Sequence, residues 1–139
     1  MSNFNDVVAF HEKFEVPVLN VPGFLSELAP DAAKFRVGFL QEELDEFKKS
    51  LEDKDLVGAY DALLDLVYVA YGTASMMGLN DEMWQELWNN VQTANMSKVR
   101  ATSASQSKRG TSLDVVKPVG WVSPETKHAE TLAKYKRNA

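Results

Sequence analysis

Apolar residues recur along most of the chain at the three- and four-residue spacing of helices, and clear breaks separate the segments with this pattern. We predict helices over residues 3–15, 31–52, 55–78 and 81–100, and a last short helix over residues 125–137. The pattern therefore predicts an all-α protein.

The signals at the ends of these segments support the assignment. In the first helix, Val7, Phe10 and Phe14 are expected to share one apolar side. Asp55 is expected to cap the third helix, and Gly78 to end it in the left-handed conformation that glycine tolerates best.

Three segments lack a helical pattern. Residues 16–30 contain three prolines and a glycine, so we expect an ordered loop that lies over the domain. Residues 101–112 are rich in Ser, Thr and basic side chains and read as a mobile loop, which an extended segment follows at residues 115–124. With 139 residues, we expect a single domain whose core spans about residues 3–100, and a loop and C-terminal extension over 101–139.

Composition narrows the class of protein. The chain has no cysteine, which excludes disulfides and thiolate metal sites. Its formal charge of -5 gives no overall attraction to long nucleic acid or to an anionic membrane, although a local basic segment could still meet phosphates.

The most apolar stretch, residues 62–79, contains Asp65, and we interpret it as a buried core helix rather than a membrane span. The first residues lack a signal-peptide pattern, so we expect a cytoplasmic protein.

The second predicted helix carries a group of acidic residues. At about 100° per residue, Glu42, Glu43 and Glu46 fall within one sector that is about 100° wide. Phe35 and Phe39 occupy the same sector one to two turns earlier, and such a line of apolar residues must be covered. We therefore expect the three glutamates to face inward rather than into solvent.

The third predicted helix provides complementary carboxylates. Asp65 is the only charged residue between Asp61 and Leu79, and an ionised carboxylate in so apolar a helix requires a partner. If the connecting turn is centred near Lys54, Glu46 lies at the height of Asp61 and Glu42 at the height of Asp65. The two acidic sets are thus expected to meet in an antiparallel pair. A divalent cation would relieve their repulsion, and oxygen-only ligands favour Mg²⁺, with Mn²⁺ as a substitute.

Three motifs, in this order and spacing, resemble a known family. The chain is similar to the all-α nucleotide pyrophosphohydrolases of the MazG-like group, which include dimeric dUTPases and phosphoribosyl-ATP pyrophosphohydrolases. It looks closest to the small MazG-like proteins of bacteria and their phages. The motifs are Glu42-Glu43-x-x-Glu46, Asp61-Ala-Leu-Leu-Asp65-Leu-Val-Tyr68 and Asn95-Met-Ser-Lys98.

The resemblance implies a four-helix-bundle-like core that assembles as a homodimer or homotetramer, which the two apolar faces of the second helix fit. It implies Mg²⁺ held by the glutamate motif and Asp65. Asp61 is a less secure ligand, because Ala62 stands where the family has its usual acid. Candidate nucleotide contacts are Asn95, Lys98, Arg100 and Tyr68, although aromatic residues such as Tyr68 are more often part of a core.

The resulting hypothesis is cleavage of a nucleoside triphosphate between the α and β phosphates, which yields a monophosphate and pyrophosphate. Glu43 or Glu46 would orient the attacking water, and the sequence does not choose between them. Lys98, with Arg100, Lys108 or Arg109, would offset phosphate charge. The alternatives are a diphosphatase specific for phosphoribosyl-ATP, dUTP or dCTP, and a non-catalytic metal-binding helical module.

Overall fold

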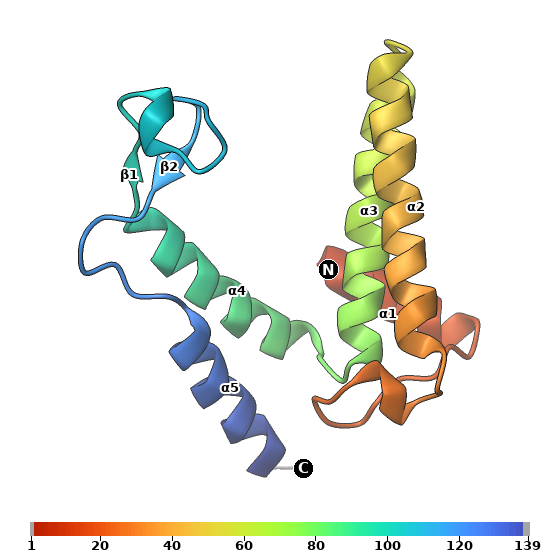
Figure 1. Cartoon of the computed structure of the whole chain (residues 1–139). Helices are drawn as coiled ribbons and strands as arrows, with labels where there is room; N and C mark the ends of the chain where they lie inside the picture. The colour runs from red at the N-terminus through yellow and green to blue at the C-terminus, as the bar shows by residue number, and fades with distance from the viewer. Residues whose placement is uncertain (1, 138–139) are drawn as a thin grey trace. The chain divides into compact units, whose positions relative to one another are not determined.

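Five α-helices make up most of the computed structural model, which describes residues 2–137 (Figure 1). The helices are α1 (Asn3–Lys13), α2 (Ala32–Glu52), α3 (Leu56–Met76), α4 (Asp81–Met96) and α5 (Glu125–Arg137). Short 3-10 helices span Leu25–Glu27 and Ala104–Gln106, and a two-stranded sheet pairs β1 (Val99–Arg100) with β2 (Val115–Val116). The all-α prediction is confirmed, and the helix starts lie within one residue of those expected.

The chain divides into two compact units, and the boundary falls within α4. The N-terminal unit extends to Trp84 and contains α1, α2 and α3, whereas the C-terminal unit comprises Gln85–Arg137. No single helix in residues 2–137 is long and apolar enough to cross a membrane, and only α3 and α4 together, as a bent pair, meet that test.

The antiparallel pair of α2 and α3 dominates the N-terminal unit (Figure 1). The turn between them is centred on Lys54, as expected, and this residue adopts a left-handed φ of 54°. The amide of Asp55 donates to the carbonyl of Ser50 at 2.8 Å, and the amide of Lys54 donates to that of Leu51 at 3.2 Å. This is the Schellman pattern that satisfies the last carbonyls of a helix, and it usually has glycine at the left-handed position.

We expect Lys54→Gly to stabilise the protein by about 0.5–1 kcal/mol, because a non-glycine residue is strained in the left-handed conformation. Urea unfolding followed by circular dichroism would measure the change. Lys48→Gly is the matched control: Lys48 lies within α2, where glycine should destabilise by about 1 kcal/mol. A loss of stability in Lys54→Gly would contradict the role assigned to this turn.

One side of α1 packs on α3 and on the start of α4. Phe4 and Val7 are the two largest side chains with almost no exposed surface, and His11 continues their side. Phe10 and Phe14 are less buried, with 43% and 56% of their surfaces exposed, although the Phe10 ring meets that of Tyr68 on α3. The two rings also contact each other in a tilted arrangement, with centroids 4.8 Å apart.

The proline-rich loop between α1 and α2 is ordered, as expected. Its backbone pairs with the end of α3, since the amide of Leu19 donates to the carbonyl of Met76 and that of Gly23 to Met77. Gly78 ends this region with φ 94°, which confirms the predicted left-handed position. A Cβ atom there would lie 2.2 Å from the Val21 carbonyl oxygen, so this close approach also requires glycine.

A buried polar cluster joins the three helices of the N-terminal unit. His11 of α1 and Arg36 of α2 are both buried, and each lies against Gly72 of α3. Arg36 donates to the Thr73 hydroxyl at 3.0 Å and to the Val69 carbonyl at 2.9 Å. Burial, and then the charge of Arg36, lower the pKa of His11 below its usual value.

We therefore expect His11 to contribute a loss of stability as the pH falls below about 6.5, the usual pKa of histidine. Below pH 6.5 the histidine is protonated in the unfolded state but still neutral in the folded state, because the folded state disfavours the charged imidazole. The stability that neutral His11 contributes therefore falls as the pH decreases from 6.5 towards its lowered pKa in the folded protein. Thermal unfolding between pH 8 and 5 would measure the slope. His11→Gln should flatten it, whereas His128→Gln, in the other unit, should not. Equal slopes in all three proteins would contradict this assignment.

The fourth helix ends earlier than predicted. It stops at Met96 rather than Arg100, and the next residues form β1. Val99 pairs with Val116 and Arg100 with Val115 in an antiparallel register. The strand that pairs with β1 lies about 15 residues further along the chain, so the local sequence pattern could not predict the sheet. In the C-terminal unit, α4 also pairs with α5 through Asn90 and His128, whose side-chain nitrogens are 3.3 Å apart.

Candidate active site

Three carboxylates from α2 and α3 converge in the N-terminal unit. Ligand oxygens of Glu43, Glu46 and Asp65 all lie within 4.8 Å of one another. Glu43 and Glu46 are one turn apart on α2, and Asp65 projects from the neighbouring helix. The antiparallel packing of the hairpin therefore gathers the acidic residues that the sequence singled out.

Glu43 is the buried member of this cluster. Only 7% of its surface is exposed, and its Oε2 atom has no hydrogen-bond partner among the described residues. Burial and the nearby charges of Glu46, Asp65 and Glu42 raise the pKa of Glu43 to about 6. A buried carboxylate oxygen without a partner is costly, so this atom is suited to bind a positive group.

Asp65, on α3, is also surrounded by negative charge. Burial raises its pKa first, and the charges of Asp61 and Glu46 raise it further. In the described part of the chain, no lysine or arginine forms an ion pair with any of the three clustered carboxylates. The negative charge of the cluster is thus left uncompensated by the N-terminal unit itself.

Two of the five candidate ligands lie outside the cluster. Glu42 is exposed, and the expectation that all three glutamates face inward is met by Glu43 alone. Asp61 is also exposed and lies one turn before Asp65. The charges of both still influence the cluster, since Glu42 acts on the pKa of Glu43 and Asp61 on that of Asp65. The structure therefore places Glu42 and Asp61 around the cluster and Glu43, Glu46 and Asp65 within it.

The donor set of the cluster fits a divalent cation. Carboxylate oxygens are the ligands that Mg²⁺ and Mn²⁺ prefer, and several ligand atoms must approach one centre from different elements. Three carboxylates on two helices meet this requirement, and the partnerless Glu43 Oε2 is a buried atom that such an ion would satisfy. These residues can accordingly hold the ion.

A hollow of about 710 Å³ adjoins α2 on the Glu42 side, lined by Asp31, Lys34, Phe35, Gly38, Phe39 and Glu42. The sequence pattern marked the two phenylalanines and Glu42, but not Lys34 and Gly38. The space beside Gly38 is open, because a Cβ atom there would meet nothing within 4 Å. Lys34, Gly38 and Glu42 follow one another at one-turn spacing, and this spacing could have predicted from the sequence that they share a face of α2.

The candidate substrate contacts are divided between the two units. Tyr68 lies on α3 in the N-terminal unit, is partly exposed and meets the edge of the Phe10 ring at a centroid distance of 5.6 Å. Asn95 and Lys98 flank the end of α4 in the C-terminal unit, where the Lys98 ammonium lies 5.2 Å from the centre of the Trp121 ring. Arg100 is exposed on β1.

An all-α fold whose helical hairpin gathers three carboxylates fits a hydrolase that holds a divalent ion. The family model of phosphoribosyl-ATP pyrophosphohydrolase matches residues 7–95, and the chain belongs to this family. It is thus a pyrophosphohydrolase, an enzyme that hydrolyses acid anhydrides. The resemblance that the motifs indicated is confirmed. Members of the family typically depend on a divalent metal, and no curated protein matches the chain.

Proposed function

We propose that the protein is a Mg²⁺-dependent nucleoside triphosphate pyrophosphohydrolase, which cleaves between the α and β phosphates to give a monophosphate and pyrophosphate. The observation that carries this proposal is the convergence of Glu43, Glu46 and Asp65 within 4.8 Å on the hairpin of a chain from this family. The family membership argues against a non-catalytic metal-binding module.

The side chains of the cluster have distinct tasks in this proposal. When bound, a divalent ion supplies charge neutralisation to the triphosphate and lowers the pKa of a nearby water. Glu43, Glu46 and Asp65 would hold the ion, and either Glu43 or Glu46 would orient the water for attack on the α phosphorus. Glu42 and Asp61 lie at the exposed margin of the cluster, where they would add negative charge to the site of the ion.

Groups outside the cluster would bind the rest of the nucleotide. We assign the sugar and phosphates to Asn95, Lys98 and Arg100, because amide and cationic side chains recognise phosphate oxygens. The hollow beside α2 offers Phe35 and Phe39 as apolar walls and Lys34 as a cation. Tyr68 has an exposed ring beside the cluster on α3, which is suitable for stacking on a base.

A substrate screen tests this proposal directly. Ordinary and modified ribo- and deoxyribonucleoside triphosphates, with dUTP, dCTP and phosphoribosyl-ATP among them, would be incubated with Mg²⁺, Mn²⁺ or EDTA. We expect release of pyrophosphate, not of single phosphate, that stops in EDTA. Turnover of phosphoribosyl-ATP alone would favour the narrower activity of the family name. Release of single phosphate, or undiminished turnover in EDTA, would refute the proposed cleavage.

We also propose that a second copy of the chain covers the apolar outer face of α2 and α3. Large apolar side chains are exposed on both helices, among them Val37 and Leu44 on α2 and Val57 and Leu64 on α3. So much exposed apolar surface on two adjacent helices is typical of a protein–protein interface. The proposed assembly is a homodimer or homotetramer.

Leu64→Lys is expected to lower the molecular mass in solution, because a charge at such an interface loses its hydration. Sedimentation equilibrium would measure the mass of both proteins at the same concentrations. Leu113→Lys is the control, since Leu113 is an even more exposed leucine in the other unit and its replacement should leave the mass unchanged. A monomeric parent protein would contradict the assembly.

A further inference from the structure

The charge of the chain is divided unevenly between its two units. Residues 1–84 contain sixteen Asp and Glu against six Lys and Arg, whereas residues 85–137 contain four against nine. The overall charge of -5 therefore conceals a basic C-terminal unit. Such an excess on one unit raises the local concentration of anions around it.

Much of this positive charge surrounds one small pocket beside the β1–β2 hairpin. The pocket has a volume of about 310 Å³ and is lined by Lys98, Gln106, Lys108, Arg109, Asp114, Val115, Val116 and Lys117. Four of these eight residues are cations, and one is an acid. The volume is at the small end of the range of about 300–1,000 Å³ that is usual for small-molecule sites.

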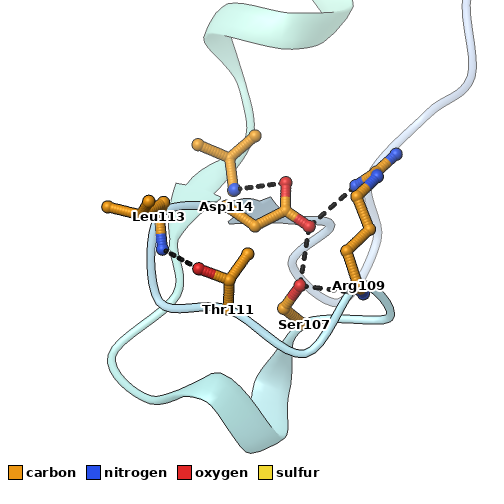
Figure 2. Close-up of polar contacts among 6 residues, drawn as sticks. Ser107, Arg109, Thr111, Leu113 and Asp114 are labelled. Carbon is orange, nitrogen blue, oxygen red and sulfur yellow. Dashed lines mark hydrogen bonds and ion pairs between the residues drawn. The ribbon is translucent and has the colours of Figure 1, made fainter. Parts of the chain in front are cut away.

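Asp114 forms an ion pair with one of the four cations, Arg109, and Figure 2 shows this contact. Its Oδ2 atom accepts from Arg109 at 2.7 Å and from the Ser107 hydroxyl at 2.8 Å, while Oδ1 accepts from the amide of Val115 at 2.9 Å. These bonds lower the pKa of Asp114, so it remains ionised. Lys98, Lys108 and Lys117 form no ion pair with a carboxylate anywhere in residues 2–137.

The hairpin register brings two of these lysines together. One position beyond the ladder, the same antiparallel register sets Lys98 opposite Lys117. Like charges at opposite positions are destabilising, yet both ammonium groups lie over the Trp121 ring, at 5.2 and 4.9 Å from its centre. The Trp121 indole is itself fixed, because Nε1 donates to the Ala94 carbonyl at 2.7 Å. The fold thus holds both ammonium groups near one fixed ring, and both lysines also line the pocket.

We infer that this pocket is a binding site for a short phosphate chain, a diphosphate or triphosphate group, held by Lys98, Lys108 and Lys117. The inference goes beyond the proposed cleavage, because binding here requires neither the acidic cluster nor a divalent ion. Lys98 belongs to the third motif, and Lys108 and Arg109 were expected from the sequence to offset phosphate charge, whereas Lys117 and the rest of the pocket carried no such expectation. All of the pocket residues follow the family match at residues 7–95.

The arrangement of the cations favours a short phosphate chain over a nucleic acid. A nucleic-acid backbone is usually bound along an extended basic groove with aromatic side chains for successive bases. Here the cations converge on one small pocket, and the nearby aromatic ring, Trp121, is flanked by two lysines. A diphosphate or triphosphate presents several oxygens in a compact space, which matches three ammonium groups.

Binding of inorganic pyrophosphate and triphosphate to the full chain in EDTA tests the inference. Without a divalent ion the acidic cluster repels these anions, so calorimetry reports on the basic pocket alone. We expect submillimolar binding that weakens with added salt. The double variant Lys108→Gln, Lys117→Gln should bind at least tenfold more weakly. The matched control, Lys127→Gln with Lys136→Gln, removes the same charge elsewhere in the unit and should bind as the parent does.

Further measurements separate this inference from the proposed activity. Glu43→Gln should retain pyrophosphate binding in EDTA even if it abolishes turnover. ATP in EDTA should bind like triphosphate and be weakened by the same double variant, which would extend the site to nucleotides. Amide chemical shifts should change at the hairpin and at the Trp121 indole. The inference fails if the parent does not bind, if the double variant and control bind alike, or if a single-stranded oligonucleotide binds more tightly than triphosphate.

Discussion

Glu43→Gln is expected to reduce nucleotide hydrolysis by about 10²–10⁴-fold, the range over which acid–base groups contribute to catalysis. The amide keeps the shape of the side chain but removes the charge that the buried oxygen would offer to a divalent ion. Asp65→Asn should have a comparable effect from the neighbouring helix. Pyrophosphate release over a range of Mg²⁺ concentrations would measure both variants, and we expect weaker Mg²⁺ activation as well as slower turnover.

Asp45→Asn is the matched control for this experiment. Asp45 lies on α2 between the clustered glutamates, but it accepts a hydrogen bond from Gln41 at 2.9 Å on an exposed side of the helix. Its loss should leave hydrolysis within a few-fold of the parent. Unchanged turnover in both Glu43→Gln and Asp65→Asn, with intact circular dichroism, would remove the cluster from the mechanism. Equal losses in all three variants would point to a general effect of charge on α2 instead.

Phe4→Ala should destabilise the protein by about 3–5 kcal/mol, the usual cost of truncating a buried phenylalanine. The Phe4 ring is only 2% exposed, stacks on Trp84 at a centroid distance of 5.6 Å and meets the edge of Tyr71 at the same distance. Its removal would leave a cavity that the rigid neighbouring rings cannot fill. Urea unfolding at one fixed protein concentration would measure the change.

Phe24→Ala provides the comparison, because Phe24 precedes the first 3-10 helix and 76% of its surface is exposed. We expect a change within about 0.5 kcal/mol, as for most surface substitutions. A small effect of Phe4→Ala would mean that α1 contributes little to the N-terminal unit. In that case the aromatic contacts of Phe4 would not stabilise the start of α4 against α3.

The family match covers only part of the chain, so what the family implies about function applies only to that part. It covers residues 7–95, which include the acidic cluster and Asn95 but neither Lys98 nor the hairpin pocket. The C-terminal unit therefore has to be understood from its own residues. Its basic excess and its fixed indole are features that the family membership does not explain.

The sequence by itself determined the helices and the identity of the acidic residues. Asp55 caps α3, with its side chain accepting from the Gly58 amide at 3.0 Å, and Gly78 adopts a left-handed conformation two residues after α3 ends. These signals are local, since a cap or a left-handed glycine acts on residues within one turn. The pairing of the two acidic helices was also predictable, because a short turn forces an antiparallel arrangement.

Only the tertiary structure decided which side chains meet. Counting from Lys54 set Glu42 opposite Asp65, but Glu43 joins the cluster: one residue moves a group by about 1.5 Å along a helix and turns it by about 100° around it. The buried side of α1 was likewise decided by packing, which selected Phe4 and His11 over Phe10 and Phe14. The hairpin of β1 and β2 depended on a partner strand far along the chain. Helix rotation, core packing and strand pairing all depend on the opposing surface, and a local pattern carries no information about that surface.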